Sequence, residues 1–489
     1  MTASSKERFS PSSSRLVVLG IVSIGFFMIP FDGSVVNVAL PSIAVSLRAT
    51  LGAIVWIPTA YLLVFAALET TIGRLGDMRG KKKLYLISVG IFTAGSLAAG
   101  LSASILELIL ARVTQGIGGA GMDAIGFSLL TTAFSGGNRG RAFGISSMII
   151  YIGLCSGPAI GGVLVQVFGW RSIFYVNVPI GIAGVILALL FLKRDEVARD
   201  ARQGFDFLGA FTLTGFLTTL LLILNGQDLR LAEAASILLD GACLAFVFSF
   251  IYVESKIAET PLLDLRLFTH NRLFAGGSAT ALMNYMTVYG TLFLLSLYLQ
   301  SILGYSPVKA GVILLAQPIF MAISSPIAGI LSDRVSARIL VSFGMASKAV
   351  AFFFLSFLGS HSSPESVIIP LVVVGIGHGF FSSPNLNSVM SSVDPKRFGI
   401  ASGMMGTIRQ SAQSIGIAVL GGIVAAHLPA GSLNVYASST LLTGGLAVDF
   451  VGGVNIAFLA ASAICAVGVF TSLIRGKKAE PSPDEVQRL

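Results

Sequence analysis

The sequence predicts an all-α, polytopic membrane protein with 14 transmembrane helices. Only 11% of the 489 residues are charged, whereas soluble domains carry about 25%, and hydrophobic residues make up 54% of the chain. The mean hydropathy is correspondingly high, at +0.86. Fourteen apolar runs have the length of about 20 residues that a helix needs to cross the hydrocarbon of a bilayer. These observations exclude a soluble fold.

The apolar runs lie between clusters of charged residues. They cover residues 16–40, 53–73, 84–102, 106–130, 142–167, 172–192, 206–225, 233–253, 273–300, 308–331, 339–359, 366–391, 398–427 and 450–474. The first six and the last six runs predict two pseudo-symmetric six-helix bundles, with two inserted helices between them. We therefore expect a cytoplasmic tail at 1–15, an N-terminal bundle at 16–192, a cytoplasmic linker with inserted spans at 193–272, a C-terminal bundle at 273–474 and a cytoplasmic tail at 475–489.

The distribution of Lys and Arg supports this topology independently. Basic residues collect on the cytoplasmic side of membrane proteins. With the N-terminus inside, 25 of the 32 Lys and Arg residues fall in cytoplasmic segments. Outer loops hold only Arg48, Arg171, Arg230 and Lys309, and the spans hold Arg112, Lys348 and Arg409. An odd number of spans would disrupt this alternation, so we expect both termini in the cytoplasm and the protein in the plasma membrane.

The sequence lacks the motifs of several other functional classes. The three cysteines, Cys155, Cys243 and Cys465, lie far apart in apolar stretches, with neither disulfide nor metal spacing. The basic residues do not form the exposed patch that a nucleic-acid partner needs. There is no phosphate-binding loop for ATP, and no motif of a serine or aspartyl intramembrane protease. We expect no cofactor, no metal, no nucleic-acid partner and no enzymatic activity.

An internal repeat relates the two predicted bundles. Gly73-Arg-Leu-Gly-Asp77 recurs as Gly329-Ile-Leu-Ser-Asp333 at an offset of 256 residues, and Phe143-Gly-Ile recurs as Phe398-Gly-Ile at 255. Repeats related by an axis along the membrane normal are typical of transporters.

The segment at residues 73–82 is predicted to be a short cytoplasmic turn between spans 2 and 3. Its glycines allow two helix ends to approach closely, and Asp77 can meet a helix N-terminus or a basic side chain across the interface between the halves. The alternative is an ordinary basic loop that sets topology. The candidate gating residues, including the repeat in the second half, are Gly73, Asp77, Gly80, Lys81, Asp333 and Arg338.

Span 4 carries two charged residues, Arg112 and Asp123. A charge at mid-span costs about 2.5 to 3.5 kcal/mol on insertion scales, so each needs a partner or a watery cavity. Their spacing places them on one helix face, about 16 Å apart, which predicts that both face one cavity. Structural ion pairs with a neighbouring helix are the alternative. Gly116 to Gly121 spells GxGxxG, but no strand precedes it, which favours helix packing.

Asp32 lies well inside span 1. Removal from water favours the neutral form of a carboxyl group, which suits a group that must take up and release a proton. We therefore regard Asp32 as a candidate proton site. A carboxylate that only pins span 1 to its neighbour is the alternative.

Span 5 carries a glycine motif, Gly153-x-x-x-Gly157-Pro158-x-x-Gly161-Gly162. Glycines at this spacing form a smooth ridge for close helix contact, and Pro158 removes one backbone hydrogen bond and bends the helix. The motif predicts a conformational role, with generic helix packing as the alternative.

Together these motifs resemble the major facilitator superfamily, in particular its 14-span drug:proton antiporter branch. The segment at 73–82 is similar to the signature loop of the superfamily, the Arg112-x-x-Gln115-Gly116 stretch to its span 4 motif, and span 5 to its antiporter motif. Asp32 to Pro41 and Ile408-Arg409-Gln410 also look like this branch. Met78, Ser34 and Ala124 depart from the usual pattern, and Asp123 and His378 have no clear place in it.

The resemblance implies two bundles around a central cavity, alternating access, export driven by inward proton flow and a monomeric state. It implies proton coupling by Asp32, Arg112 and Asp123, and a cavity lined by spans 1, 4, 9 and 12. Candidate substrate-cavity residues on the last two of these spans are Asn284, Tyr285, Tyr289, His378 and Asn385. We expect His378 to be a hydrogen-bonded polar residue, and Lys348 and Asp240 to be structural partners.

The predicted function is a proton-coupled secondary active transporter that exports amphipathic small molecules, such as drugs and antibiotics. Its partners would be a small-molecule substrate, protons and the lipid bilayer. Two alternatives stay open: an exporter of one specific endogenous metabolite or lipid, and a proton symporter.

Overall fold

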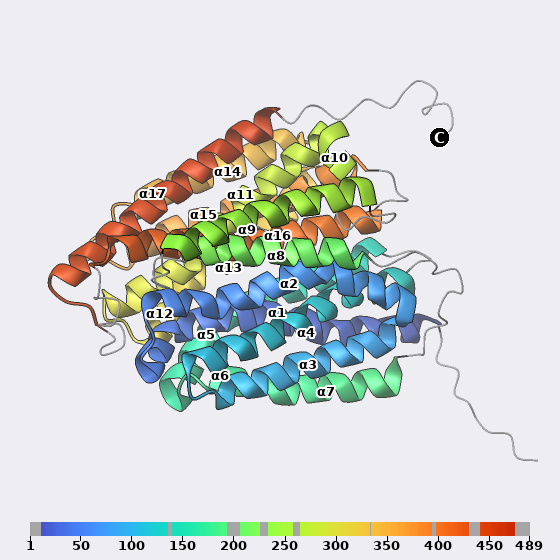
Figure 1. The fold of residues 1–489 in the computed structure, drawn as a ribbon, viewed down its shortest axis with the longest axis horizontal. Helices are drawn as coiled ribbons and strands as arrows, with labels where there is room; N and C mark the ends of the chain where they lie inside the picture. Colours follow the sequence, from blue (N-terminus) through green and yellow to red (C-terminus); the bar gives the residue numbers. More distant parts are fainter. Residues whose placement is uncertain are drawn as a thin grey trace, which may run out of the picture.

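The computed structural model describes residues 11–134, 139–192, 206–224, 233–257, 265–332, 334–393, 398–429 and 441–474. Every regular element in these ranges is a helix (Figure 1). The first half contains α1 (Pro11–Leu47), α2 (Leu51–Arg79), α3 (Lys81–Leu101), α4 (Ile105–Ala133), α5 (Arg139–Phe168), α6 (Ser172–Tyr175) and α7 (Asn177–Phe191). Next come α8 (Phe207–Leu224), α9 (Glu233–Tyr252), which continues as a π-helical turn at Val253–Ile257, and α10 (Leu265–His270). The second half contains α11 (Arg272–Ser301), α12 (Pro307–Leu314), α13 (Ala316–Leu331), α14 (Ala337–Leu355), α15 (Glu365–Met390), α16 (Phe398–His427) and α17 (Gly445–Ile474).

Membrane-spanning character is clear for most of these helices. Among the described residues, 11 helical segments are long and apolar enough to cross a bilayer. All 14 predicted runs coincide with helices, but α4, α8 and α16 are not among the 11 segments, so the predicted number of spans is not confirmed. In α4 the reason is its composition, because glycines and buried charged residues lower its hydropathy. The described part of α8 is short, at 18 residues.

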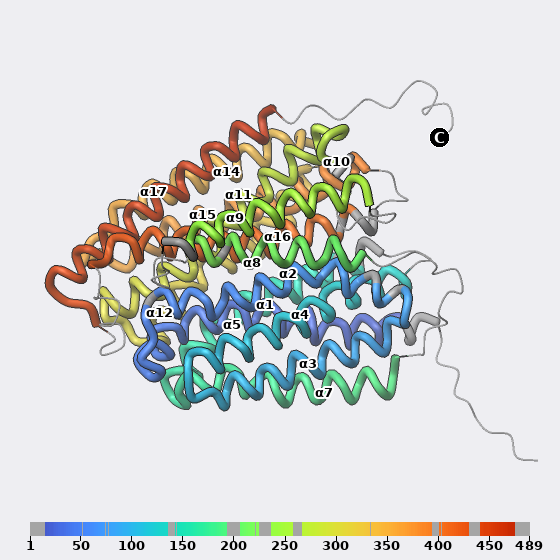
Figure 2. Tube along the Cα trace, in the orientation of Figure 1, coloured from blue at the N-terminus to red at the C-terminus, as the bar shows by residue number. Residues whose placement is uncertain are grey.

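The same helix pairs pack together in both halves. In the first half α4 packs against α2 and α3, and α5 packs against α1. In the second half α15 packs against α13 and α14, and α16 packs against α11, in the corresponding order. Figures 1 and 2 show α1 to α7, in blue to teal, on one side of the molecule and α11 to α17, in yellow to red, on the other. The helix pairs that pack together thus correspond between the two halves.

The two halves meet along a seam that α1, α2 and α5 form with helices of the second half. α1 packs against α11, α2 packs against α16, and α5 packs against α12 and α13. Side chains bond directly across this seam: Gln300 Nε2 donates to the carbonyl of Val38 over 3.0 Å, and the Thr70 and Thr407 hydroxyls are 3.0 Å apart. The inserted helix α8 lies against both α2 and α16, and α9 packs on α8. These contacts place the inserted pair beside the seam rather than inside either bundle.

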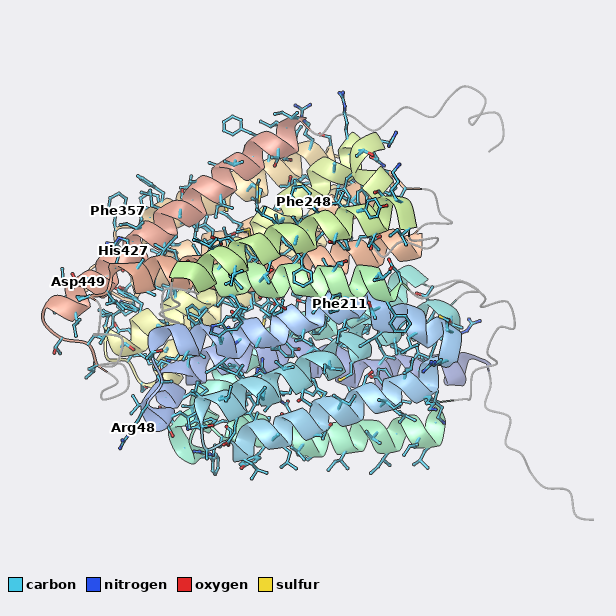
Figure 3. The ribbon with its side chains drawn as sticks, viewed as in Figure 1. Arg48, Phe211, Phe248, Phe357, His427 and Asp449 are labelled. Carbon is cyan, nitrogen blue, oxygen red and sulfur yellow. The ribbon has the colours of Figure 1, made fainter. Side chains whose placement is uncertain are left out.

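The outer surface of the helices is apolar. Phe211, Phe248 and Phe357 are each about two-thirds exposed, and Figure 3 shows Phe211 and Phe248 near the middle of the helices. In the same view Arg48, His427 and Asp449 lie at one end of the helix stack. A surface with apolar side chains around the middle and polar ones at the end fits a lipid environment.

The predicted turn at residues 73–82 is mostly helical, which corrects the sequence-based expectation. α2 continues to Arg79 and α3 begins at Lys81, so Gly80 alone separates them. Gly80 has a φ of 97°, in the left-handed region that glycine adopts without strain, and its N–H donates to the carbonyl of Gly76. α2 extends beyond the apolar run because the polar residues of its last turns can still form helical backbone hydrogen bonds outside the hydrocarbon.

The candidate gating residues are only partly described. Gly73 faces α4, where an added Cβ would lie 3.4 Å from the Cβ of Ala124. Lys81 Nζ donates to Thr132 Oγ1 over 2.8 Å, which ties α3 to the end of α4. Arg338 is half-buried near the start of α14. The Asp77 side chain and Asp333 lie outside the described residues, so the predicted contact of Asp77 across the interface stays a prediction.

Candidate functional site

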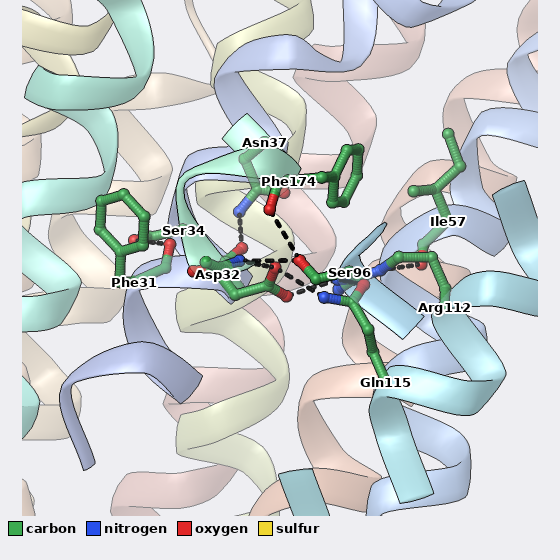
Figure 4. Close-up of polar contacts among 11 residues, drawn as sticks. Phe31, Asp32, Ser34, Asn37, Ile57, Ser96, Arg112, Gln115 and Phe174 are labelled. Carbon is green, nitrogen blue, oxygen red and sulfur yellow. Dashed lines mark hydrogen bonds and ion pairs between the residues drawn. The ribbon is translucent and has the colours of Figure 1, made fainter. Parts of the chain in front are cut away.

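The deepest polar cluster surrounds Asp32 of α1. Its carboxylate is fully buried and forms an ion pair with Arg112 of α4, which is 1% exposed (Figure 4). Gln115, one turn along α4, donates to Asp32 Oδ1 over 3.1 Å, and Asn177 of α7 donates to the same oxygen over 3.0 Å. Three donors from two helices therefore converge on one carboxylate. The spacing of Arg112 and Gln115 puts both on the α4 face that meets α1.

The guanidinium of Arg112 is held on several sides. Its Nε donates to the carbonyl of Ile57 over 3.3 Å, and its Nη1 also donates to Gln115 Oε1 over 2.8 Å. Its Cζ lies 4.3 Å from the ring centroid of Tyr61 on α2, at cation–π distance. A buried ion pair is stable only when further hydrogen bonds satisfy both partners, and this pair has them.

This geometry gives the Asp32–Arg112 pair a structural role, because it pins α1 to α4. Since the carboxylate is fully buried, its charge has to be compensated by a positive partner. Removing Arg112 alone would leave an isolated buried charge, which costs several kcal/mol.

Asp123 lies on the same helix as Arg112 but has different partners. Its Oδ2 is 3.2 Å from Arg409 Nη2 on α16, and the same nitrogen is 3.9 Å from Glu69 Oε1 on α2. The sequence predicts that Arg112 and Asp123 face one common cavity. In the structure they belong to two clusters, one within the first half and one across the seam. Sequence analysis missed Glu69, although a carboxylate inside the apolar run at 53–73 was a usable signal. It noted Arg409 only as a basic residue within a span and as part of a family motif.

A third cluster joins three helices of the second half. Lys348 of α14 donates to Asn284 Oδ1 and to Thr287 Oγ1 of α11, each over 2.8 Å. The Asn284 amide nitrogen lies 3.1 Å from His378 Nδ1 of α15. Because the Asn284 oxygen accepts from Lys348, its amide group donates to His378, which must then be a neutral imidazole at that nitrogen. The geometry thus matches the expectation of a hydrogen-bonded His378.

The remaining candidate cavity residues separate into two environments. The Tyr285 ring packs edge-on against His378 and Phe381, with centroids 5.6 and 6.3 Å apart, so it belongs to the third cluster. Tyr289, one turn further along α11, is half-buried. Asn385 is buried and donates to the carbonyl of Gly277 over 3.1 Å, which ties α15 to α11.

The glycine motif of α5 faces two helices. A Cβ added at Gly153 would lie 2.5 Å from the carbonyl oxygen of Phe27, and one at Gly157 would lie 2.9 Å from the Val35 nitrogen, so this ridge packs directly on the α1 backbone. Gly161 continues it against Val35. Gly162 turns toward the other half, where an added Cβ would lie 2.7 Å from the Pro307 carbonyl oxygen. The Pro158 carbonyl closely approaches Gly311 of α12. The motif therefore joins α1 to the seam between the halves.

Comparisons with known proteins agree with this architecture. The model of the Major Facilitator Superfamily matches residues 22–417. The riboflavin transporter RibZ of Clostridioides difficile is 33% identical over 414 residues, covering 85% of this chain and 89% of that protein. The multidrug resistance protein Stp of Mycobacterium tuberculosis is 33% identical over 419 residues, covering 85% of this chain and 77% of its own length.

A solved structure supports the fold. The bacterial homologue of the human lysosomal transporter Spinster, in an inward-facing unoccupied conformation, aligns with a TM-score of 0.66 at 17% identity, covering 96% of this chain and 98% of that one. These relatives are transporters, not enzymes. Because the family model matches most of its length, the chain belongs to the major facilitator superfamily.

Proposed function

We propose that the protein is a proton-coupled secondary active transporter that exports amphipathic small molecules by alternating access. The observation that carries the proposal is the fully buried Asp32–Arg112 pair, which is held by further donors inside one half of a membrane transporter. Intramembrane ionisable residues are functional-site candidates because their cost must be offset. In this proposal Asp32 takes up the proton, Arg112 stabilises its ionised form, and Asp123 couples that step to the second half.

Alternating access requires the halves to rock against each other about a fixed site. The seam suits such a motion because glycines and backbone carbonyls, rather than interlocked large side chains, form its closest contacts at Gly162 and Gly311. We propose that the α5 motif transmits movement of α1 to the seam. Tyr285, Tyr289, Asn284, His378 and Asn385 would line the substrate cavity on the second half.

The proposal includes the full topology. It has 14 spans, two bundles at 16–192 and 273–474, the inserted pair within 193–272, cytoplasmic tails at 1–15 and 475–489, and a monomer in the plasma membrane. Coincidence of every predicted run with a helix supports the spans, and the alternation of Lys and Arg supports the orientation. A membrane potential supplies about 2.3 kcal/mol per charge per 100 mV. One proton could therefore sustain a gradient of roughly fifty-fold, since about 1.4 kcal/mol corresponds to ten-fold.

The test is a substrate panel in proteoliposomes with an imposed pH gradient. Ethidium, as a cationic amphipathic dye, and riboflavin, as a neutral metabolite, are the probes. Export coupled to protons predicts that the gradient concentrates a probe and that a protonophore abolishes the accumulation. Equal movement of every active probe with and without the gradient would reject proton coupling.

Transport of one specific metabolite is the second candidate function. The similarity to a protein described as a riboflavin transporter favours it. Saturable movement of riboflavin alone, with no movement of ethidium or other cationic dyes, would select this candidate over multidrug export.

A further inference from the structure

We propose that Glu69, Asp123 and Arg409 form a second proton-binding site, at the seam between the halves, whose proton affinity depends on how closely α16 approaches α2 and α4. The inference rests on the proton-coupled transport proposed above, and it adds a site there that does not involve Asp32. We call these three residues the seam triad.

The seam triad is built from both halves of the protein. Glu69 comes from α2 and Asp123 from α4, and both are about 95% buried, at 6% and 5% exposure. Arg409 comes from α16 and contacts both carboxylates, at 3.2 Å to Asp123 and 3.9 Å to Glu69. Separation of α16 from both α2 and α4 therefore breaks the two ion pairs together.

Charge balance indicates that the seam triad holds a proton. If both carboxyl groups are ionised, the seam triad has a net charge of one negative unit. In the described part of the chain no second cation lies within ion-pair distance of it. Glu69 Oε2 is buried and accepts no hydrogen bond from any residue that the structure describes. An unpartnered carboxylate oxygen in an apolar interior is costly when charged. A proton on this oxygen removes the net charge, and two carboxyl groups that share a site rarely both ionise.

The packing around Glu69 keeps its carboxyl group against the second half. A Cβ added at Gly406 of α16 would lie 2.8 Å from Glu69 Cδ and 3.0 Å from its Oε2. The neighbouring residue Thr70 is 3.0 Å from the Thr407 hydroxyl. The absence of a side chain at Gly406 thus leaves the space that the Glu69 carboxyl group occupies, one helical turn from Arg409.

Arg409 is the accessible member of the seam triad. Its side chain is 32% exposed, whereas those of the two carboxylates are 8% and 7% exposed. The other titratable groups that act on these charges are phenols: Tyr61 of α2, Tyr285 and Tyr289 of α11, and Tyr151 of α5 beside them. Phenols ordinarily titrate near pH 10. The exchange of protons near neutral pH therefore falls to the two carboxyl groups.

These contacts give the seam triad a coupling mechanism. While the seam is closed, Arg409 favours the ionised form of one carboxyl group, and the other holds a proton. When α16 withdraws, the carboxyl groups lose this cation, and a second proton from water takes its place. When α16 returns, Arg409 displaces that second proton to water. When the proton affinity of a group differs between two conformations, a change of pH shifts the equilibrium between them. By linkage, the ratio of the two proton affinities equals the factor by which protonation changes that equilibrium.

Infrared spectroscopy of the purified full-length protein in lipid nanodiscs tests this site without a substrate. The readout is the C=O stretching band of protonated carboxyl groups as a function of pH. Glu69→Gln and Asp123→Asn should each remove or shift a titrating component of this band. Arg409→Gln should move the midpoint of that component to higher pH by about one to three units, the effect of losing an opposite charge at this distance. Asp240→Asn, on the exposed face of α9, is the matched control for loss of an intramembrane acid.

The possible outcomes separate this site from Asp32. If Glu69→Gln and Asp123→Asn change the pH dependence of this C=O band no more than Asp240→Asn does, the seam triad is not a proton site. Asp32→Asn in the same assay addresses the proposed function alone, because the Asp32 component can be lost while that of Glu69 remains. If Arg409→Gln does not fold, Arg409→Lys retains a cation without the planar fork and should keep the midpoint closer to the wild-type value. Arg409→Met removes the charge as Arg409→Gln does, and an unshifted midpoint in whichever of these two variants folds would overturn the role of Arg409.

Discussion

Asp123 and Arg409 are 286 residues apart in the sequence, yet their side chains meet at 3.2 Å across the two halves of the protein. The contact joins α4, which also carries Arg112, to α16. One helix thus connects the buried Asp32 cluster of the first half with the seam between the halves.

Substitution at the glycine ridge should slow the movement of the halves. In Gly157→Ala the added methyl group would meet Ser34 and the Val35 backbone nitrogen of α1. Overpacking of this kind typically costs about 1 to 3 kcal/mol, so we expect lower thermal stability and slower turnover in proteoliposomes. Gly144→Ala is the matched control on the same helix, because an added Cβ there would meet nothing within 4 Å. Equal thermal stability and equal turnover of the two variants would show that close packing at the glycine ridge does not limit the movement of the halves.

Loss of the Asn177 donor should change the pH dependence of transport. Asn177 donates to Asp32 Oδ1 over 3.0 Å, and hydrogen bonds to charged groups contribute about 1.5 to 3 kcal/mol. Asn177→Leu removes a donor that stabilises the ionised carboxylate, so under the proposed proton coupling the pH dependence of transport should move to higher pH. We expect the midpoint of the rate against pH to rise by about one unit, since one unit corresponds to about 1.4 kcal/mol. A pH profile that coincides with that of the wild type would show that the hydrogen bond from Asn177 to Asp32 Oδ1 does not contribute to proton coupling.

Charge selectivity should depend on Asp123. Asp123→Asn leaves Arg409 with Glu69 as its remaining acidic partner at the seam. A cationic probe such as ethidium should then be bound less well, by about ten-fold or more, while a neutral probe such as riboflavin should be affected little. Binding of both probes to the purified protein, measured by fluorescence, gives the comparison. Equal losses for the two probes would indicate a purely structural role for Asp123.

The sequence could predict the helices because lipid imposes a simple rule. Each apolar run must satisfy its backbone hydrogen bonds internally, so each becomes a helix, and every predicted run coincides with one. The ends of helices were harder to predict. α2 extends six residues past its apolar run, to Arg79, because hydropathy marks the edge of the hydrocarbon and not the end of the helix.

Individual site residues could be predicted from charge, but their partners could not. Asp32, Arg112 and Asp123 stood out because charged residues inside a span need compensation. Helical spacing suggested a single cavity for Arg112 and Asp123. Their actual partners, Asp32 and Arg409, lie on other helices, and helix-to-helix packing is not encoded in the spacing along one helix. Glu69 and Lys348 gained their significance only through this packing.

The most direct test of proton coupling through Asp32 compares uphill transport with exchange in the same proteoliposomes. Asp32→Asn should fail to concentrate ethidium or riboflavin, whichever the wild type concentrates under an inward proton gradient. It should retain exchange of labelled for unlabelled probe, which needs no proton. Asp240→Asn should behave as the wild type in both assays. Undiminished concentration of the probe by Asp32→Asn would contradict the account.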